Sequence, residues 1–213
     1  MNLFDLLLDD EKQSQANRIN GVVVGVVTNN QDPEGMGRVK VRFPWLSDTD
    51  ESHWARIAAP MAGNQRGVYF LPEVEDEVLV AFEQGDARFP YVLGALWNGK
   101  DAPPAINDGK NNIRVIKSRS GHVIRLSDED GKEKIEVIDK SEKNSVVIET
   151  ANNTITITAS QDIILSATNG TIKLVAQNIE VESSAATKIK AGTDVDVEGA
   201  LNTNIKGALV NIN

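Results

Sequence analysis

The residues best suited to chemistry lie in the first half of the chain. Asp48, Asp50 and Glu51 form an acidic run, and His53 follows it directly after one serine. Carboxylates and an imidazole at such short spacing could bind a divalent metal ion. A charged, solvated loop between two strands accounts for the same residues, since acidic side chains are mostly exposed. We therefore predict no metal site.

A second acidic group lies at residues 73–77 and contains Glu73, Glu75, Asp76 and Glu77. Paired carboxylates of this kind could perform general acid–base catalysis. The sequence has no evident nucleophile–base pair and no phosphate-binding glycine loop to accompany them. We expect these acids to solvate the turn into a strand, and we predict no catalytic residue and no cofactor.

Aromatic and basic side chains also gather between residues 38 and 54, as they do in surfaces on which nucleic-acid bases stack. The chain carries a net charge of -9, however, whereas general nucleic-acid binders carry a basic stripe. We expect barrel-core packing and contacts between copies instead, and no nucleic-acid partner. The residues concerned are Arg38, Lys40, Arg42, Phe43, Trp45 and Trp54.

The elements that carry these residues are short strands. Residues 38–43 alternate basic and apolar side chains, which places Val39, Val41 and Phe43 on one inward face. Turn-forming residues, such as those at 63–64, separate the segments. Five or six short strands in about 80 residues are typical of a small closed barrel such as an OB-fold. The strand candidates are residues 21–28, 38–43, 54–59, 67–71, 77–83 and 91–97.

Composition changes sharply in the middle of the chain. All ten aromatic residues lie at or before Trp97, and all seven prolines lie at or before Pro104. Residues 98–108 contain glycine and two prolines, which marks a linker between domains. Beyond the linker, residues 112–126 and 134–138 predict two longer strands joined by a turn, which together form a neck.

From about Ala151 to the last residue, the chain repeats roughly every eight residues. Each unit joins a short polar turn to a triplet whose apolar residues stand two apart and therefore share one face of a strand. A fixed short period indicates a stacked rod rather than a pocket. The residues predicted to face inward are Ile155, Ile157, Ile163, Leu165, Ile172, Leu174, Ile179, Val181, Val195 and Val197.

The repeat favours a rod shared by several chains. A unit of roughly eight residues is too short to complete one turn of a single-chain β-helix. Three units could form one triangular rung, but this chain would then hold fewer than three rungs. If three chains each supply one face of every rung, the same units give a long prism without open strand edges. We predict the intertwined trimer, with a single-chain solenoid as the less favoured alternative.

Three segments closely resemble the OB-domain signature of VgrG-like spike proteins: residues 32–41, 67–82 and 85–99. This family includes phage baseplate assembly protein V and the spikes of type VI secretion and extracellular contractile injection systems. The resemblance implies a homotrimer whose OB domains form a collar and whose C-termini wind into a β-helical needle. It also implies a place at the centre of a baseplate, ahead of the inner tube when the sheath contracts.

Departures from the family pattern qualify these expectations. Many VgrG proteins begin with a large hub domain, whereas this signature starts near residue 18, so we expect a separate baseplate hub protein. The apolar run Leu3–Leu8, within an N-terminal docking segment at residues 1–17, could help to bind it. Some phage spikes carry a lysozyme domain between barrel and needle, and residues 98–145 are too few for one.

The end of the needle also departs from some relatives. Certain protein V tips bind iron through a His-x-His repeat, whereas this chain has only His53 and His122, both far from its last residues. We therefore expect a separate PAAR-like tip protein. The predicted contact residues are Val210, Asn211, Ile212 and Asn213.

The sequence thus predicts an all-β protein with an OB-fold barrel at residues 18–100. A linker and β neck follow at 101–145, and a trimeric β-helix needle at 146–213. We expect a non-enzymatic spike that contacts a target membrane transiently. No signal peptide is recognised, so we expect assembly in the cytoplasm. The rival hypotheses are an OB-fold module that binds nucleic acid or glycan on a β-helical stalk, and a tail-associated hydrolase.

Overall fold

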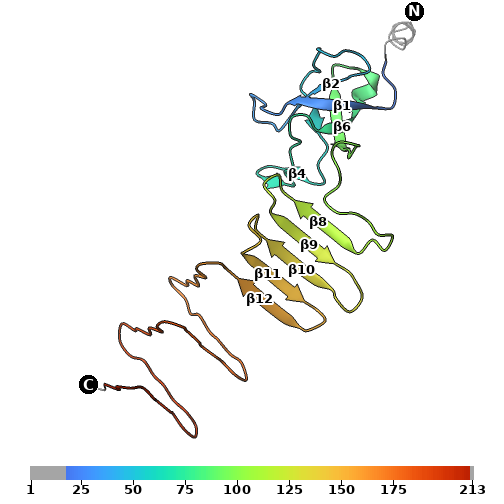
Figure 1. Cartoon of the computed structure of the whole chain (residues 1–213). Coiled ribbons are helices and arrows are strands. Elements are labelled where there is room, and N and C mark those ends of the chain that lie inside the picture. The colour runs from blue at the N-terminus through green and yellow to red at the C-terminus, as the bar shows by residue number, and fades with distance from the viewer. Residues whose placement is uncertain (1–17, 212–213) are drawn as a thin grey trace, which may run out of the picture. The chain divides into compact units, whose positions relative to one another are not determined.

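The computed structural model describes residues 18–211 (Figure 1). The predicted docking segment at residues 1–17 and the predicted tip residues Ile212 and Asn213 lie outside this range. The chain divides into two compact units, of which the first ends at Ser160 and the second begins at Gln161. None of the helices in the described range has the length and hydrophobicity of a transmembrane span.

The first unit begins with a five-stranded sheet whose strand order is β2-β1-β6-β7-β3. Neighbouring strands are antiparallel except β3 and β7, which are parallel. A two-stranded hairpin and a single 3-10 turn, η1 (Glu83–Gly85), complete this domain. The strands are β1 (Val22–Asn29), β2 (Lys40–Arg42), β3 (Arg56–Ile57), β4 (Ala62–Gly63), β5 (Arg66–Gly67), β6 (Glu77–Phe82) and β7 (Pro90–Ala95).

The core of this domain follows from alternation along the strands. In β6, the residues at every second position are buried, while those between them are only half-buried. The predicted inward positions Val39, Val41 and Phe43 are confirmed, since the first two are 0% exposed and the third 8%. Gly25 lets β1 pass close to β2, because a Cβ there would lie 2.3 Å from Cγ1 of Val41. The full core set is Val27, Val39, Val41, Phe43, Ala55, Val78, Val80, Phe82 and Val92.

The sheet is half of a barrel and is consistent with the OB-like domain that the sequence predicts. The strand predicted at residues 67–71 is wrong. The turn lies at residues 64–65, one position beyond the predicted 63–64, and closes a hairpin in which Ala62 pairs with Gly67, where the strand ends. Tyr69 and Phe70 follow in an extended segment and are 76% and 68% exposed.

A second five-stranded sheet follows within the same unit. It is an antiparallel meander in the order β12-β11-β10-β9-β8, and we call it the neck sheet. The strand predicted at residues 134–138 is confirmed as β10. The neck sheet continues through β11 and β12, beyond the predicted domain boundary at residues 145–146. The start of the needle at residue 146 stays a prediction. Its strands are β8 (Ile113–Lys117), β9 (Val123–Ser127), β10 (Lys134–Ile138), β11 (Ser145–Glu149) and β12 (Thr154–Thr158).

One neck prediction is wrong: residues 112–126 are not a single strand but the hairpin β8–β9. The chain reverses at residues 118–121, where the Gly121 N–H donates to the Ser118 carbonyl at 2.9 Å. Gly121 has φ +101°, a left-handed conformation that glycine adopts without steric cost. Ser118 Oγ also accepts the His122 N–H at 3.0 Å, which closes the turn.

The second unit contains no assigned strand over its described residues, 161–211. It is an extended trace that reverses direction repeatedly (Figure 1), and its described side chains are exposed. The structure of the single chain thus leaves the β-helical needle a prediction.

Candidate functional site

The neck sheet has two chemically different faces, and the pairing register defines them. Directly paired residues of antiparallel strands share one face. Leu126 pairs with Ile135, and Ile135 with Ile148. A second row two residues along the strands belongs to the same face. We call this surface the apolar neck face; its members are Ile116, Ile124, Leu126, Ile135, Val137, Val146, Ile148, Ile155 and Ile157.

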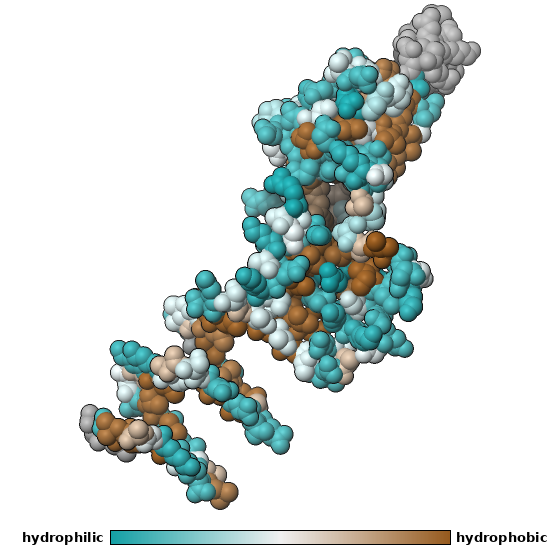
Figure 2. Space-filling model, in the orientation of Figure 1, coloured by the Kyte–Doolittle hydropathy of each residue, from teal (hydrophilic) through white to brown (hydrophobic). Residues whose placement is uncertain are grey.

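These nine aliphatic side chains are all partly exposed to solvent. Their exposed fractions run from 38% for Val146 to 69% for Ile155. Figure 2 shows brown, apolar residues at the surface over the neck strands. Single exposed apolar residues are ordinary on a protein surface, but a contiguous apolar patch of this kind marks a site of interaction.

The opposite face of the neck sheet is mixed, with Val115, Val123, Ile138 and Val147 among charged and polar side chains. Glu136 on β10 is 6% exposed and lies between two cations. Its carboxylate lies 3.5 Å from Nη1 of Arg125, its direct cross-strand partner on β9, and 3.0 Å from Nζ of Lys134. Val147 of β11 and Thr156 of β12 continue this row. The sheet therefore has one almost wholly apolar face, which is exposed, and one mixed face that carries the Glu136 ion pairs.

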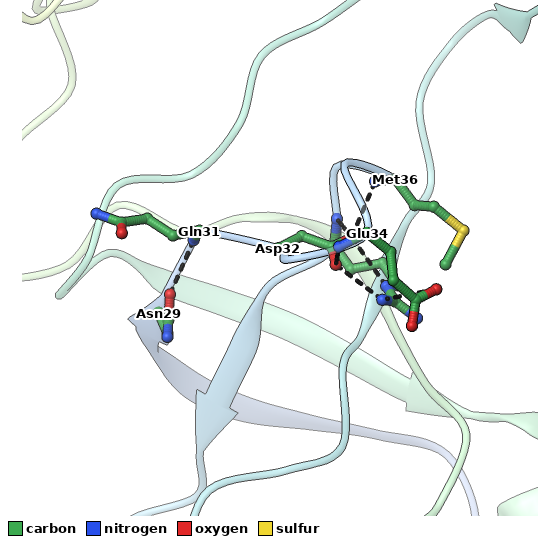
Figure 3. Close-up of polar contacts among 6 residues, drawn as sticks. Asn29, Gln31, Asp32, Glu34 and Met36 are labelled. Carbon is green, nitrogen blue, oxygen red and sulfur yellow. Dashed lines mark hydrogen bonds and ion pairs between the residues drawn. The ribbon is translucent and has the colours of Figure 1, made fainter.

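In the OB domain, the carboxylate of Asp32 accepts several hydrogen bonds and so fixes the loop between β1 and β2 (Figure 3). Asp32 accepts the backbone N–H groups of Glu34, Met36 and Arg38 at 3.0–3.2 Å. It also accepts hydrogen bonds from Nε and Nη2 of Arg38, at 2.9 and 2.7 Å. The Arg38 guanidinium holds the pKa of Asp32 well below its usual range. The Asp32 side chain is 2% exposed, so its role is to fix the turn rather than to bind a ligand.

The acidic groups that the sequence singled out serve ordinary structural roles. Glu51 pairs with Nζ of Lys40 at 3.0 Å, which lowers the pKa of Glu51. Asp76 accepts the Glu73 N–H at 2.9 Å within a turn, and Glu73 pairs with Arg119 at 3.1 Å. Within residues 18–211, no three acidic or histidine side chains come together as a metal site.

The aromatic and basic group is divided between different environments. Phe43 lies in the barrel core, where its ring centroid is 5.6 Å from that of Phe82. Trp54 is half-buried, and the cations of Arg38 and Lys40 lie 5.8 and 5.7 Å from its ring centroid. Trp45 is 54% exposed. The structure thus places one aromatic ring in the core and does not assemble the set into one stacking platform.

The residues predicted for the trimer core divide between the two units. Ile155 and Ile157 lie on β12 in the apolar neck face. The remaining members lie in residues 161–211, with exposed fractions from 51% for Ile172 to 75% for Val181. Of the predicted tip residues, Val210 and Asn211 are described and exposed.

The seven other members of the apolar neck face are functional candidates that the sequence reading missed. The signal that could have found them is the two-residue apolar alternation within residues 123–127, 134–138 and 145–149. It indicates which side of each strand is apolar, and the antiparallel register then gathers those sides into one surface.

A family model described as the type VI secretion system/phage-baseplate injector OB domain matches residues 23–97. The match spans the half-barrel from β1 to the residues that follow β7. The chain is VgrG-like. The resemblance that the OB-domain segments carry in the sequence is thereby confirmed, and the Asp32 turn is part of the matched domain.

Curated VgrG proteins match over larger parts of the chain. The type VI secretion system spike protein VgrG3 of Vibrio cholerae is 35% identical over 102 residues, 44% of this chain and 10% of that protein. VgrG1a of Pseudomonas aeruginosa, also a type VI secretion system spike protein, is 28% identical over 138 residues, 59% of this chain and 22% of that protein.

A further V. cholerae relative, an actin cross-linking toxin named VgrG1, is 31% identical over 108 residues. That match covers 46% of this chain and 10% of the toxin. The chain thus spans between a tenth and under a quarter of the relatives described.

Proposed function

We propose that this VgrG-like chain is a structural, non-enzymatic spike of a contractile injection system and works as a homotrimer. The observation that carries the proposal is the apolar neck face, which directly follows an injector OB domain. An exposed apolar face on an ordered sheet is stable in water when another apolar surface covers it.

Three copies supply that cover most simply. With threefold symmetry, three neck sheets turn their apolar faces toward a common axis and keep the face that carries Glu136 outside. Each half-covered aliphatic side chain then stabilises the assembly by roughly 1 kcal/mol. The predicted inward residues from Ile163 to Val197 continue the same core into a needle.

The proposed action is mechanical. The needle concentrates force on a small area of the target envelope, and its shared core resists unwinding. Residues 161–213 contain no proline, so nothing in the repeat forces a break in a strand. A separate hub protein would bind residues 1–17, and a PAAR-like tip would bind Val210 to Asn213. Assembly takes place at the baseplate in the producing cell.

A charge placed in the needle core tests this proposal. Ile172→Lys would bury three unpaired ammonium groups in each trimer, which costs several kcal/mol per group and should prevent assembly or unwind the needle. Thr171→Lys is the matched control, because it adds the same charge one residue away on the outward side. Trimer yield and melting midpoint are measured by light scattering and circular dichroism.

The two variants should behave differently if Ile172 faces the shared core. Thr171→Lys should assemble as the unmodified protein does, while Ile172→Lys should not. Equal trimer yield and equal melting for both variants would contradict the inward assignment of Ile172.

A further inference from the structure

The charged residues of the repeat occupy only one side of its pattern. Residues 161–213 contain ten charged side chains, and each directly precedes or follows an isoleucine or valine of the apolar pattern. Since residues two apart share a face, all ten lie on the side opposite the predicted core. They are Asp162, Lys173, Glu180, Glu182, Lys188, Lys190, Asp194, Asp196, Glu198 and Lys206.

These charges are sorted by sign from one unit to the next. No unit of the repeat mixes acids and bases, and the sign reverses at every step along the chain. In order, the units carry Asp162; Lys173; Glu180 and Glu182; Lys188 and Lys190; Asp194, Asp196 and Glu198; and finally Lys206. The pattern forms alternating charge bands over six successive units.

The neck sheet demonstrates how this chain uses opposite charges across strands. Arg125 of β9 and Glu136 of β10 are direct cross-strand partners, and their side chains pair at 3.5 Å. Opposite charges at facing positions stabilise adjacent strands, and like charges at those positions destabilise them. The charge bands lie beyond the neck sheet, from Asp162 to Lys206.

We propose that the charge bands set the register in which three copies of this chain wind together. This inference rests on the proposed trimer. In a three-chain β-helix, each chain passes to the next face of the prism with every unit. On any one face, a unit of one copy therefore stacks against the following unit of another copy. Alternating signs make every such contact attractive.

The same pattern opposes two wrong assemblies. If one chain slips by one unit, the acidic band of Glu180 and Glu182 falls at the level of bands of its own sign in place of opposite ones. In-register stacking of identical units, the arrangement of cross-β aggregates, places like charges directly above one another. The partner that this surface fits is thus a second copy of the chain, offset by one unit.

Reversing one band tests the proposal in the full-length chain. Lys188→Glu with Lys190→Glu makes three consecutive units acidic, so attraction becomes repulsion on both sides of the altered unit. We expect the trimer melting midpoint to fall by at least about 5 °C. The matched control is Lys140→Glu with Lys143→Glu, which makes the same charge change at exposed positions between β10 and β11.

Two further measurements separate register from net charge. Reversing all ten charges keeps the alternation, so that variant should melt within about 2 °C of the unmodified trimer. Raising salt to about 1 M screens charge interactions. It should therefore destabilise the unmodified trimer and stabilise the Lys188→Glu, Lys190→Glu variant.

The outcomes also distinguish this inference from the proposed function. If the unmodified chain is a stable monomer, the proposed trimer itself fails. If the unmodified chain is a trimer but the Lys188→Glu, Lys190→Glu variant melts like its matched control, only the register inference is overturned. The register inference is also overturned if the variant with all ten charges reversed melts as low as the Lys188→Glu, Lys190→Glu variant.

Discussion

The OB sheet and the neck sheet have the same number of strands and the same alternation of apolar residues, yet they treat those residues differently. In the OB domain, Val78, Val80 and Val92 are 0% exposed, because the sheet and its loops close over their own core. In the neck, Ile124 and Ile135 are both 45% exposed. Alternation thus reports which side of a strand is apolar, and it does not report what covers that side.

The same substitution placed in each sheet gives the largest expected effect. Val80→Asp introduces a carboxylate where no water reaches, which should cost about 3 kcal/mol or more and unfold the barrel. Ile124→Asp should leave the barrel folded and abolish the trimer. Tryptophan fluorescence reports the barrel, because all three tryptophans lie at or before Trp97. Light scattering reports the assembly.

The matched control for Ile124→Asp is Thr156→Asp, which adds a carboxylate at an exposed position on the opposite face of the neck sheet. That variant should remain a trimer with an unchanged barrel. The comparison between the sheets breaks down if Ile124→Asp lowers barrel stability as much as Val80→Asp does, or if it assembles as well as Thr156→Asp.

Acid should produce a smaller effect that belongs to the barrel. The Arg88 side chain lowers the pKa of Asp86 to about 2, so the Asp86–Arg88 contact stabilises the fold fully above the unfolded-state value near 3.8. The stabilisation is lost as the pH falls from about 4 to about 2. Because Arg88 is largely exposed, we expect the loss of this contact to account for only a few degrees of the fall in the barrel melting midpoint.

Asp86→Asn provides the control for the acid effect. The amide does not titrate, so the variant should start with a slightly lower melting midpoint and lose less of it between pH 4 and pH 2. An equal loss in both proteins would assign the acid sensitivity to other groups and remove Asp86 from the account.

The parts of the fold set by local pattern could be predicted from the sequence. Val39, Val41 and Phe43 alternate with basic residues, and the structure buries all three. The strand at residues 134–138 also has the predicted bounds. The turn at residues 118–121 was missed because strand-forming residues flank it on both sides, although Ser118, Ser120 and Gly121 are typical turn residues. The strand predicted at residues 67–71 is wrong because its residues favour strand locally, whereas the structure offers no neighbouring strand for them beyond Gly67.

Only the part of the apolar neck face that lies within the eight-residue repeat could be predicted from the sequence. Ile155 and Ile157 were selected from their spacing, whereas Ile124 and Ile135 were not, although they lie on the same face. Joining them requires the register of five strands, which depends on how each hairpin pairs with the next and not on the pattern within one strand. The charge bands, by contrast, are visible in the sequence, but their meaning depends on neighbours supplied by other copies.

The central claim is that the open apolar surface of the neck and needle is the shared core of three chains. The most direct test is the absolute mass of the purified full-length chain, determined by size-exclusion chromatography with multi-angle light scattering. The account predicts a single species at three times the chain mass of 23.1 kDa, stable on dilution. A folded, stable species at 23.1 kDa would contradict it.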